Sequence, residues 1–132
     1  MFRKAPWLIA LILLCGAALA APAYAQQAAL KRTVLQKIDF PGKRWRTVIV
    51  LVELAPNGNV ARHTHPGVEM GYVLEGETDL TIDGQPARHL KAGDSYRIPA
   101  AVPHSAKAGD TTVKIVATFV VDKHKPFSSP AP

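Results

Sequence analysis

HTHPGVEMGYVLEG, residues 63–76, places two histidines one residue apart and a glutamate beyond a Pro-Gly turn. Side chains at positions i and i+2 of a β-strand share one face, so His63 and His65 point the same way, about 6.6 Å apart along the backbone. The Pro-Gly pair reverses the chain, and Glu69, at the start of the next strand, can return a carboxylate to the two rings. The stretch predicts a strand-turn-strand unit with three convergent metal-ligating side chains.

A second stretch, GDSYRIPAAVPH at residues 93–104, ends in another histidine. His104 is a fourth possible ligand for the same ion. Three imidazoles and one carboxylate suit divalent first-row metals such as Fe, Mn, Ni, Cu or Zn. Because the ligands must be deprotonated, metal affinity is expected to weaken as the pH falls through the histidine range near about 6.5.

The segments around these two stretches are short, rich in β-branched residues and separated by turn signals. Residues 56–59 (PNGN) and 83–84 (DG) are typical of turns. Strands are expected at residues 46–54, 60–65, 69–74, 77–82, 87–90, 95–99 and 112–121, with an outer strand around residues 34–40. This pattern favours an all-β sandwich or barrel.

The first 25 residues have the organisation of a cleavable signal peptide. A positive start (Arg3, Lys4) precedes an apolar run at residues 7–20, and Ala23-Tyr24-Ala25 fits the signal-peptidase rule. The run is shorter than the roughly 20 residues of a membrane-spanning helix, although an uncleaved anchor remains the alternative. We expect a periplasmic or secreted protein with no stable membrane span. Cleavage removes the single cysteine, Cys15, so no disulfide is expected in the mature chain.

Length and charge limit the remaining possibilities. A chain of 132 residues suits a single domain, which we divide into a lead-in strand (26–43), a barrel (44–122) and a flexible tail (123–132). The formal net charge is +6, but the cations are scattered and the densest group, residues 43–46, heads an apolar strand. Nucleic-acid surfaces need clustered cations and stacking aromatics, so we expect a small-molecule partner and no nucleic acid.

The two stretches resemble the two sequence motifs of the cupin superfamily, and the short gap between them resembles its compact single-domain bacterial members. The first motif, HxH-x3-E-x6-G, corresponds to His63, His65, Glu69 and Gly76, and the second corresponds to Gly93, Pro99 and His104. The resemblance implies a small jelly-roll β-barrel. It also implies that His63, His65, Glu69 and His104 are the ligands of one divalent transition metal.

Three positions depart from the family pattern. The first glycine stands at Gly58 rather than at Asn57, Ala101 replaces a usual glycine, and Ala108 replaces a frequent asparagine. None of these changes removes a proposed ligand.

Several residues near the motifs have weaker predicted roles. Four could line the mouth of the barrel: Arg62, Tyr72, Tyr96 and Arg97. Asp94 is expected to accept backbone N–H bonds at a turn. His89 and His124 are interpreted as surface residues, and Met70 and Phe119 as core residues.

Three functions from different classes follow for such a site. The first is a metal-dependent oxidoreductase resembling the quercetin dioxygenase-like cupins, with Glu69 as both ligand and catalytic base. The second is a non-redox lyase or isomerase, and the third is a sensor or binding module for a small anionic or aromatic ligand. A homodimer is also expected, because the apolar edge strand in the lead-in is a liability that pairing with a second chain relieves.

Overall fold

The computed structural model describes residues 29–132, so the expected signal peptide lies outside the described residues. The described part forms ten β-strands: β1 (Leu30–Asp39), β2 (Trp45–Leu54), β3 (Asn59–Thr64), β4 (Gly67–Glu75), β5 (Glu77–Ile82), β6 (Arg88–Lys91), β7 (Ser95–Ile98), β8 (His104–Ala108), β9 (Val113–Asp122) and β10 (Ser129–Pro130). No helix within residues 29–132 is long and apolar enough to cross a membrane.

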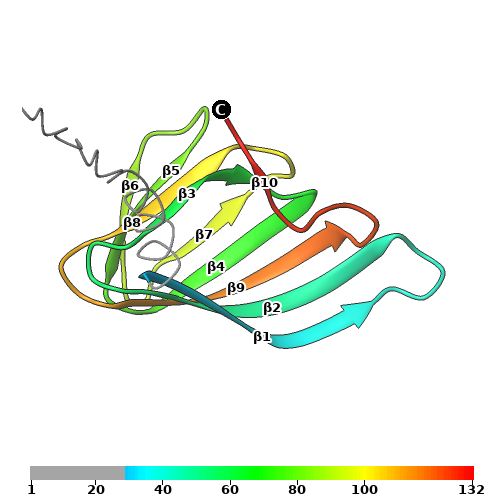
Figure 1. Cartoon of the computed structure of the whole chain (residues 1–132), viewed down its shortest axis with the longest axis horizontal. Coiled ribbons are helices and arrows are strands. Elements are labelled where there is room, and N and C mark those ends of the chain that lie inside the picture. The colour runs from blue at the N-terminus through cyan, green and yellow to red at the C-terminus, as the bar shows by residue number, and fades with distance from the viewer. Residues whose placement is uncertain (1–28) are drawn as a thin grey trace, which may run out of the picture.

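The strands form two five-stranded antiparallel sheets that face each other (Figure 1). The first sheet has the order β1-β2-β9-β4-β7, and the second has the order β10-β3-β8-β5-β6. The chain alternates between the sheets as it passes from β2 to β5, so consecutive strands often lie in opposite layers. This arrangement confirms the expected all-β jelly roll.

The core lies between the two sheets and follows from alternation along the strands. In β9, which is paired on both edges, every second side chain from Val113 to Phe119 is buried. Leu80, Ile82 and Leu90 meet this row from the second sheet. Phe119 is buried as expected, but the assignment of Met70 to the core is wrong, because this side chain lies on the outer face of β4 and is 50% exposed.

Two segments differ from the sequence-based expectation. Strand β8 was not anticipated because HSAKA lacks an apolar pattern, yet it lies between β3 and β5 and pairs with both. Residues 123–132 were expected to be loose, but β10 pairs with β3, and Phe127 packs against Phe119 with ring centroids 4.8 Å apart. Partial burial of the Phe127 ring stabilises the packing of the tail against the barrel.

Strand β1 is the edge strand of the first sheet and pairs with β2 over its whole length. A bulge between Val34 and Gln36 shifts the register. Residues directly opposite each other in an antiparallel pair share a face, and Arg32 and Val34 stand opposite Val52 and Val50. Both therefore lie on the same face of the sheet as the buried Val50, although Val34 itself is 60% exposed.

Gly71 of β4 makes room for the ring of Tyr96 on the neighbouring strand β7. The two residues are paired in the ladder, and a Cβ at position 71 would lie 2.2 Å from Cζ of Tyr96. A glycine is therefore needed at position 71, because any larger residue would overlap the ring of Tyr96.

Replacing Gly71 with alanine is expected to lower the free energy of unfolding by about 1–3 kcal/mol, because the added methyl group forces the tyrosine ring to move. Chemical denaturation measures the change. Gly109→Ala is the matched control, since the nearest heavy atom to a Cβ there is 4.0 Å away. Equal stability of the two variants would contradict the close packing described.

Candidate metal centre

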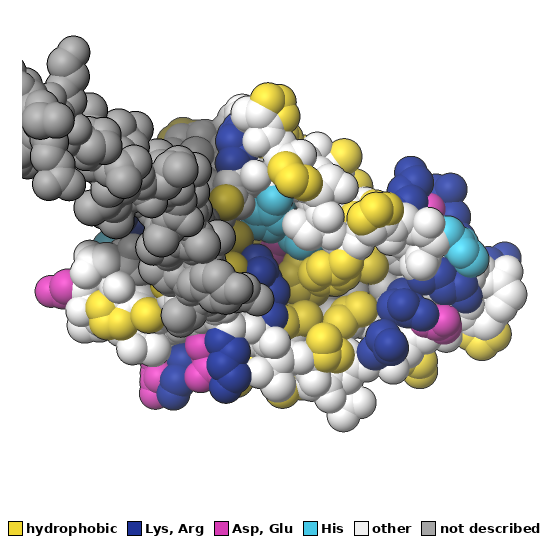
Figure 2. Space-filling model, viewed as in Figure 1, with side chains coloured by type: hydrophobic (Ala, Val, Ile, Leu, Met, Phe, Trp, Pro, Cys, Tyr) yellow, Lys and Arg dark blue, Asp and Glu magenta, His cyan; other side chains and the backbone are white. Residues whose placement is uncertain are grey.

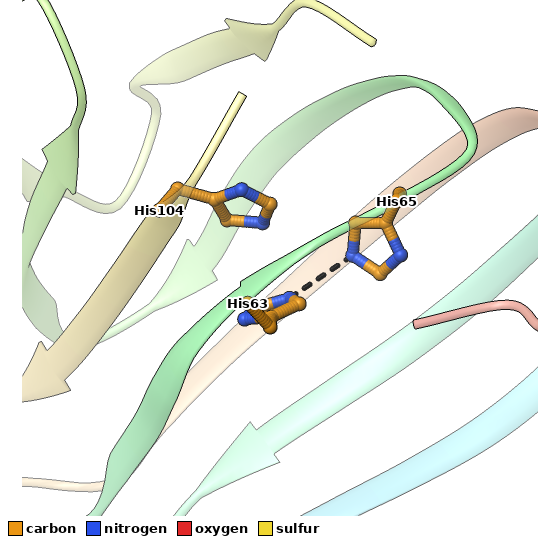
Figure 3. A group of neighbouring side chains, drawn as sticks. All are labelled: His63, His65 and His104. Atoms are coloured by element: carbon orange, nitrogen blue, oxygen red, sulfur yellow. Dashed lines mark hydrogen bonds between the residues drawn. The ribbon is translucent and has the colours of Figure 1, made fainter. Parts of the chain in front are cut away.

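Three histidines meet inside the barrel (Figure 3). His63 lies on β3, His65 follows its last residue, and His104 begins β8, where it pairs directly with His63. The ring centroid of His63 lies 4.7 Å from that of His65 and 4.2 Å from that of His104. All three side chains are buried.

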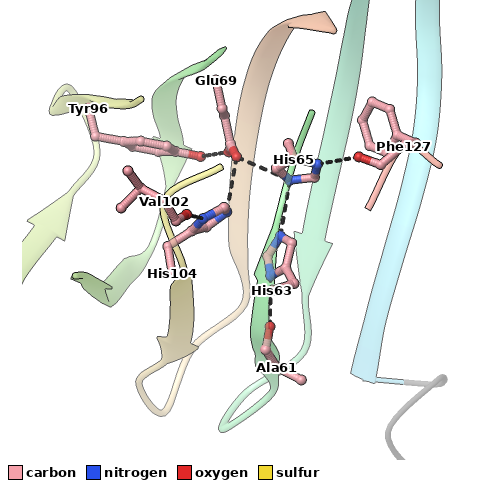
Figure 4. Close-up of polar contacts among 8 residues, drawn as sticks. All are labelled: Ala61, His63, His65, Glu69, Tyr96, Val102, His104 and Phe127. Atoms are coloured by element: carbon pink, nitrogen blue, oxygen red, sulfur yellow. Dashed lines mark hydrogen bonds and ion pairs between the residues drawn. The ribbon is translucent and has the colours of Figure 1, made fainter. Parts of the chain in front are cut away.

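Each imidazole is oriented by a main-chain carbonyl (Figure 4). Nδ1 of His63 lies 2.7 Å from the Ala61 oxygen, and Nδ1 of His104 lies 2.9 Å from the Val102 oxygen. Nδ1 of His65 lies 2.6 Å from the Phe127 oxygen. A carbonyl can only accept, so each Nδ1 carries the proton and each Nε2 has a free lone pair. The three lone pairs point toward one another.

Glu69 completes the cluster from β4. Its Oε2 lies 3.4 Å from Nε2 of His65 and 3.3 Å from Nε2 of His104, and the Nε2 atoms of His63 and His65 are 3.0 Å apart. Acceptors this close repel one another unless a proton or a cation lies between them. In the described part of the chain, Nε2 of His104 is a buried polar atom without a hydrogen-bond partner.

The donor set therefore fits a divalent transition metal. Bonds of about 2.1 Å at angles between octahedral and tetrahedral place ligand atoms about 3.0–3.4 Å apart, which is the spacing of the measured contacts. The nitrogens that the three histidines offer all lie within 4.8 Å of one another. A bound cation would satisfy the lone pairs that the carbonyl contacts leave facing inward.

Tyr96 fixes the carboxylate of Glu69. The tyrosine hydroxyl donates a 2.7 Å hydrogen bond to Oε1, which leaves Oε2 directed at the histidines. Burial acts to raise the pKa of Glu69, but a proton on His104 and the hydroxyl of Tyr96 act more strongly in the opposite direction, so the pKa lies below its usual value. Burial, together with the neighbouring carboxylate, raises the pKa of Tyr96 well above its usual value. Glu69 is thus an anion beside a neutral phenol.

Burial also acts on the histidines. It lowers the pKa of His63 to about 4 and lowers that of His65 as well. At neutral pH both rings are uncharged, which is the state that binds metal.

A small cavity of about 40 Å³ adjoins the cluster and is mostly apolar. Its walls include Val52, Ile98, Ile115 and Phe119, and one cation, Arg32, contributes to the same lining. Figure 2 looks into the opening, where histidine and carboxylate atoms lie beside a basic side chain and a hydrophobic floor. The site is a small cavity with apolar walls and one polar end.

The other residues singled out in the sequence have different positions. Tyr96 contacts the cluster, whereas Tyr72 and Arg97 line a depression on the outer side of the first sheet. Arg62 forms a bidentate pair with Asp83 away from the site. Asp94 accepts the backbone N–H of Lys91, as expected for a turn. His89 and His124 are exposed.

Two residues beside the cluster were not anticipated from the sequence and lie outside both motifs. Arg32 comes from β1, and Phe127 comes from the tail, where its ring stacks edge-on against His65 at 5.0 Å. The only sequence signal for Arg32 is its spacing of two from Val34 in a strand. A single aromatic residue among prolines was the only signal for Phe127.

Residues 50–121 match the cupin domain family, and the chain belongs to it. It is 43% identical over 74 residues to the HTH-type transcriptional regulator PuuR of Escherichia coli, covering 54% of this chain and 40% of that protein. It is 35% identical over 80 residues to H2HPP isomerase of Bacillus subtilis, covering 60% and 33%. The chain thus spans less than half the length of either relative.

Solved structures show the same fold. The DMSP lyase DddQ from Ruegeria pomeroyi superposes with a TM-score of 0.68 at 20% identity, covering 80% of this chain and 53% of that one. A recombinant oxalate oxidase in complex with glycolate has a TM-score of 0.61 at 25% identity, covering 77% and 55%.

The lowered histidine pKa values change the expected pH dependence of metal binding. The sequence alone places the loss of affinity near about pH 6.5, but His63 stays neutral until about pH 4. Because burial lowers the pKa of His65 as well, protons should compete for the nitrogens of these two ligands mainly below the ordinary histidine range, and affinity for Zn²⁺ should fall as the pH approaches about 4. Calorimetric titration at several pH values measures this window, and a steep loss beginning at about pH 6.5 would contradict it.

Ligand variants provide the control for this titration. His104→Ala should weaken Zn²⁺ binding by more than about 100-fold, because it removes a ligand from a buried site. His89→Ala is the matched exposed variant and should leave the affinity unchanged. Parental affinity in the variant that replaces His63, His65, Glu69 and His104 with alanine would exclude the site.

Proposed function

We propose that this protein is a metal-dependent enzyme, an oxidoreductase of the dioxygenase type, that acts on a small organic substrate. Its ion would be held by His63, His65, Glu69 and His104. The observation that carries the proposal is the convergence of three imidazole lone pairs and one carboxylate oxygen beside an apolar cavity. A purely structural cluster would not need an adjoining cavity.

The residues of the chain have separate roles in this proposal. When bound, the ion supplies Lewis acidity and, for Fe or Mn, one-electron chemistry with dioxygen. The neutral histidines hold the ion, while Glu69 adds a charge that Tyr96 orients. Glu69 is also the catalytic base that we propose, because its carboxylate lines the cavity beside the histidines. The apolar walls exclude water from the reacting groups.

The comparisons support more than one reaction. Similarity in structure to an oxalate oxidase supports the redox proposal. Sequence similarity to an isomerase favours a second candidate, a non-redox lyase or isomerase that uses the same site. The match to a transcriptional regulator favours a third candidate, a module that binds a small ligand without turnover.

Oxygen consumption distinguishes these candidates. The purified protein, loaded in turn with Fe²⁺ and Mn²⁺, is mixed with small organic acids and phenols in an oxygen electrode. We expect oxygen uptake that follows metal content and is lost at least about 100-fold in His104→Ala. Product formation without oxygen would instead support the lyase or isomerase, and binding without any product would support the sensor.

We also propose that the chain is exported, on the basis of residues 1–25.

A homodimer is a further proposal, supported by the outer face of the first sheet. Four alternate residues of β4 are exposed there: Val68, Met70, Tyr72 and Leu74. Ile38 of β1, whose ladder partner is Thr47, adds to the same face and is 69% exposed. Such a continuous apolar face is typical of a protein–protein interface.

Sedimentation tests the dimer. We expect the parent protein to sediment as a dimer at tens of micromolar, and Met70→Glu to be a monomer because it buries a charge in the interface. Thr81→Glu, on the exposed face of β5 in the second sheet, is the matched control and should remain dimeric. A monomeric parent would exclude the proposal.

A further inference from the structure

Arg32 lines two adjacent hollows of the barrel. It belongs to the wall of the metal cavity, together with His65 and Glu69. It also belongs to the wall of a groove of about 270 Å³ that lies between β1, β2 and the segment after β9. Among residues 29–132, Arg32 is the one charged residue that both linings share, so it lies where the groove meets the metal centre.

The position of Arg32 follows from the strand register. Arg32 and Val34 face inward opposite Val52 and Val50, and the bulge after Val34 returns Lys37 to the same face opposite Val48. The inner face of β1 therefore presents a cation, an apolar side chain and a second cation in order. Arg32 as a residue is exposed, but burial of its guanidinium lowers its pKa, while Glu69 acts in the opposite direction. Its side chain lines the same cavity as the cluster.

The groove has an apolar floor and a basic rim. Its floor consists of Val34, Val48, Val50, Val121 and Phe127. Its rim consists of Arg32, Lys37, Arg46, Lys123, Lys125 and one carboxylate, Asp122. The volume of about 270 Å³ lies just below the range of about 300–1,000 Å³ found for small-molecule sites.

Part of this positive charge has no partner among the described residues. Arg46 and Lys123 pair with Asp39, and Asp122 lies near Arg44. Within residues 29–132, Arg32 forms no ion pair with a carboxylate at salt-bridge distance, and neither do Lys37 and Lys125. A cation that is partly buried beside an apolar floor is typical of a site for an organic anion.

We propose that the substrate is a carboxylate with an apolar substituent, anchored by Arg32 at the inner end of the groove. Its carboxylate would pair with the guanidinium beside the metal centre, and its hydrocarbon part would lie over Val34, Val50 and Phe127. This inference rests on the proposed metal-dependent function but concerns binding, which can be measured without turnover.

The test uses 3-phenylpropanoate, its neutral amide and acetate as probes, with calorimetry on metal-free and Zn²⁺-loaded protein. Zn²⁺ has no redox chemistry, so binding is separated from oxidation. We expect the acid to bind at least about 10-fold more tightly than the amide, since a charge-assisted bond is lost in the amide. Acetate should bind more weakly than the acid because it lacks the apolar group.

Arg32→Gln should weaken binding of 3-phenylpropanoate at least about 10-fold and remove most of the preference for acid over amide. Arg88→Gln, an arginine of the second sheet outside the groove, is the matched control and should change neither. Val34→Asn should weaken 3-phenylpropanoate but leave acetate unaffected. Circular dichroism confirms that each variant is folded.

The inference is overturned if the acid and the amide bind equally, or if Arg32→Gln behaves like Arg88→Gln. These results are distinct from a failure of the proposed function. Protein that binds 3-phenylpropanoate through Arg32 but holds no Zn²⁺ would support the anion site and exclude the metal enzyme. Oxygen uptake with only neutral substrates, unchanged in Arg32→Gln, would exclude the anion site alone.

Discussion

Contacts between an imidazole Nδ1 and a main-chain carbonyl determine which nitrogen atoms the barrel interior offers to a metal ion. Three such contacts, to Ala61, Val102 and Phe127, fix the tautomer and the orientation of each ring. The Nε2 atoms then face one another and the carboxylate of Glu69 at distances where lone pairs repel. The interior is organised around a position of concentrated negative potential that only a proton or a cation relieves, and the apolar walls intensify it by excluding water.

The barrel supports this arrangement through strand pairing. His63 and His104 are direct partners across β3 and β8, while Glu69 is brought from the opposite sheet by β4. A slip of one residue in β3 would turn the side chain of His63 to solvent. The register of the second sheet therefore determines which side chains reach the site. The position of Tyr96 depends in turn on Gly71, because a side chain at position 71 would overlap the tyrosine ring.

Alternation along the chain was sufficient to predict an all-β sandwich or barrel and most strands, while the resemblance of the two motifs to the cupin family implied the jelly roll and the four clustered side chains. Long-range contacts were not predictable in the same way. Strand β8 has no apolar pattern because its neighbours on both edges determine its conformation. Arg32 and Phe127 reach the site only through pairing of β1 with β2 and of β10 with β3.

Two departures from the family pattern also have a structural meaning, since Asn57 and Ala101 have positive φ values of 60° and 61°. Asparagine tolerates this region, whereas alanine is strained there.

The C-terminal segment has a practical consequence for how this protein is handled. Its carbonyl at Phe127 orients His65, and its last strand pairs with Thr64 and His63. An affinity tag or a fusion partner appended after Pro132 would adjoin the segment that pairs with His63 and orients His65. Metal content measured on protein tagged at that end would then report the tag as well as the site. Metal content should therefore be compared in protein with and without residues appended at that end.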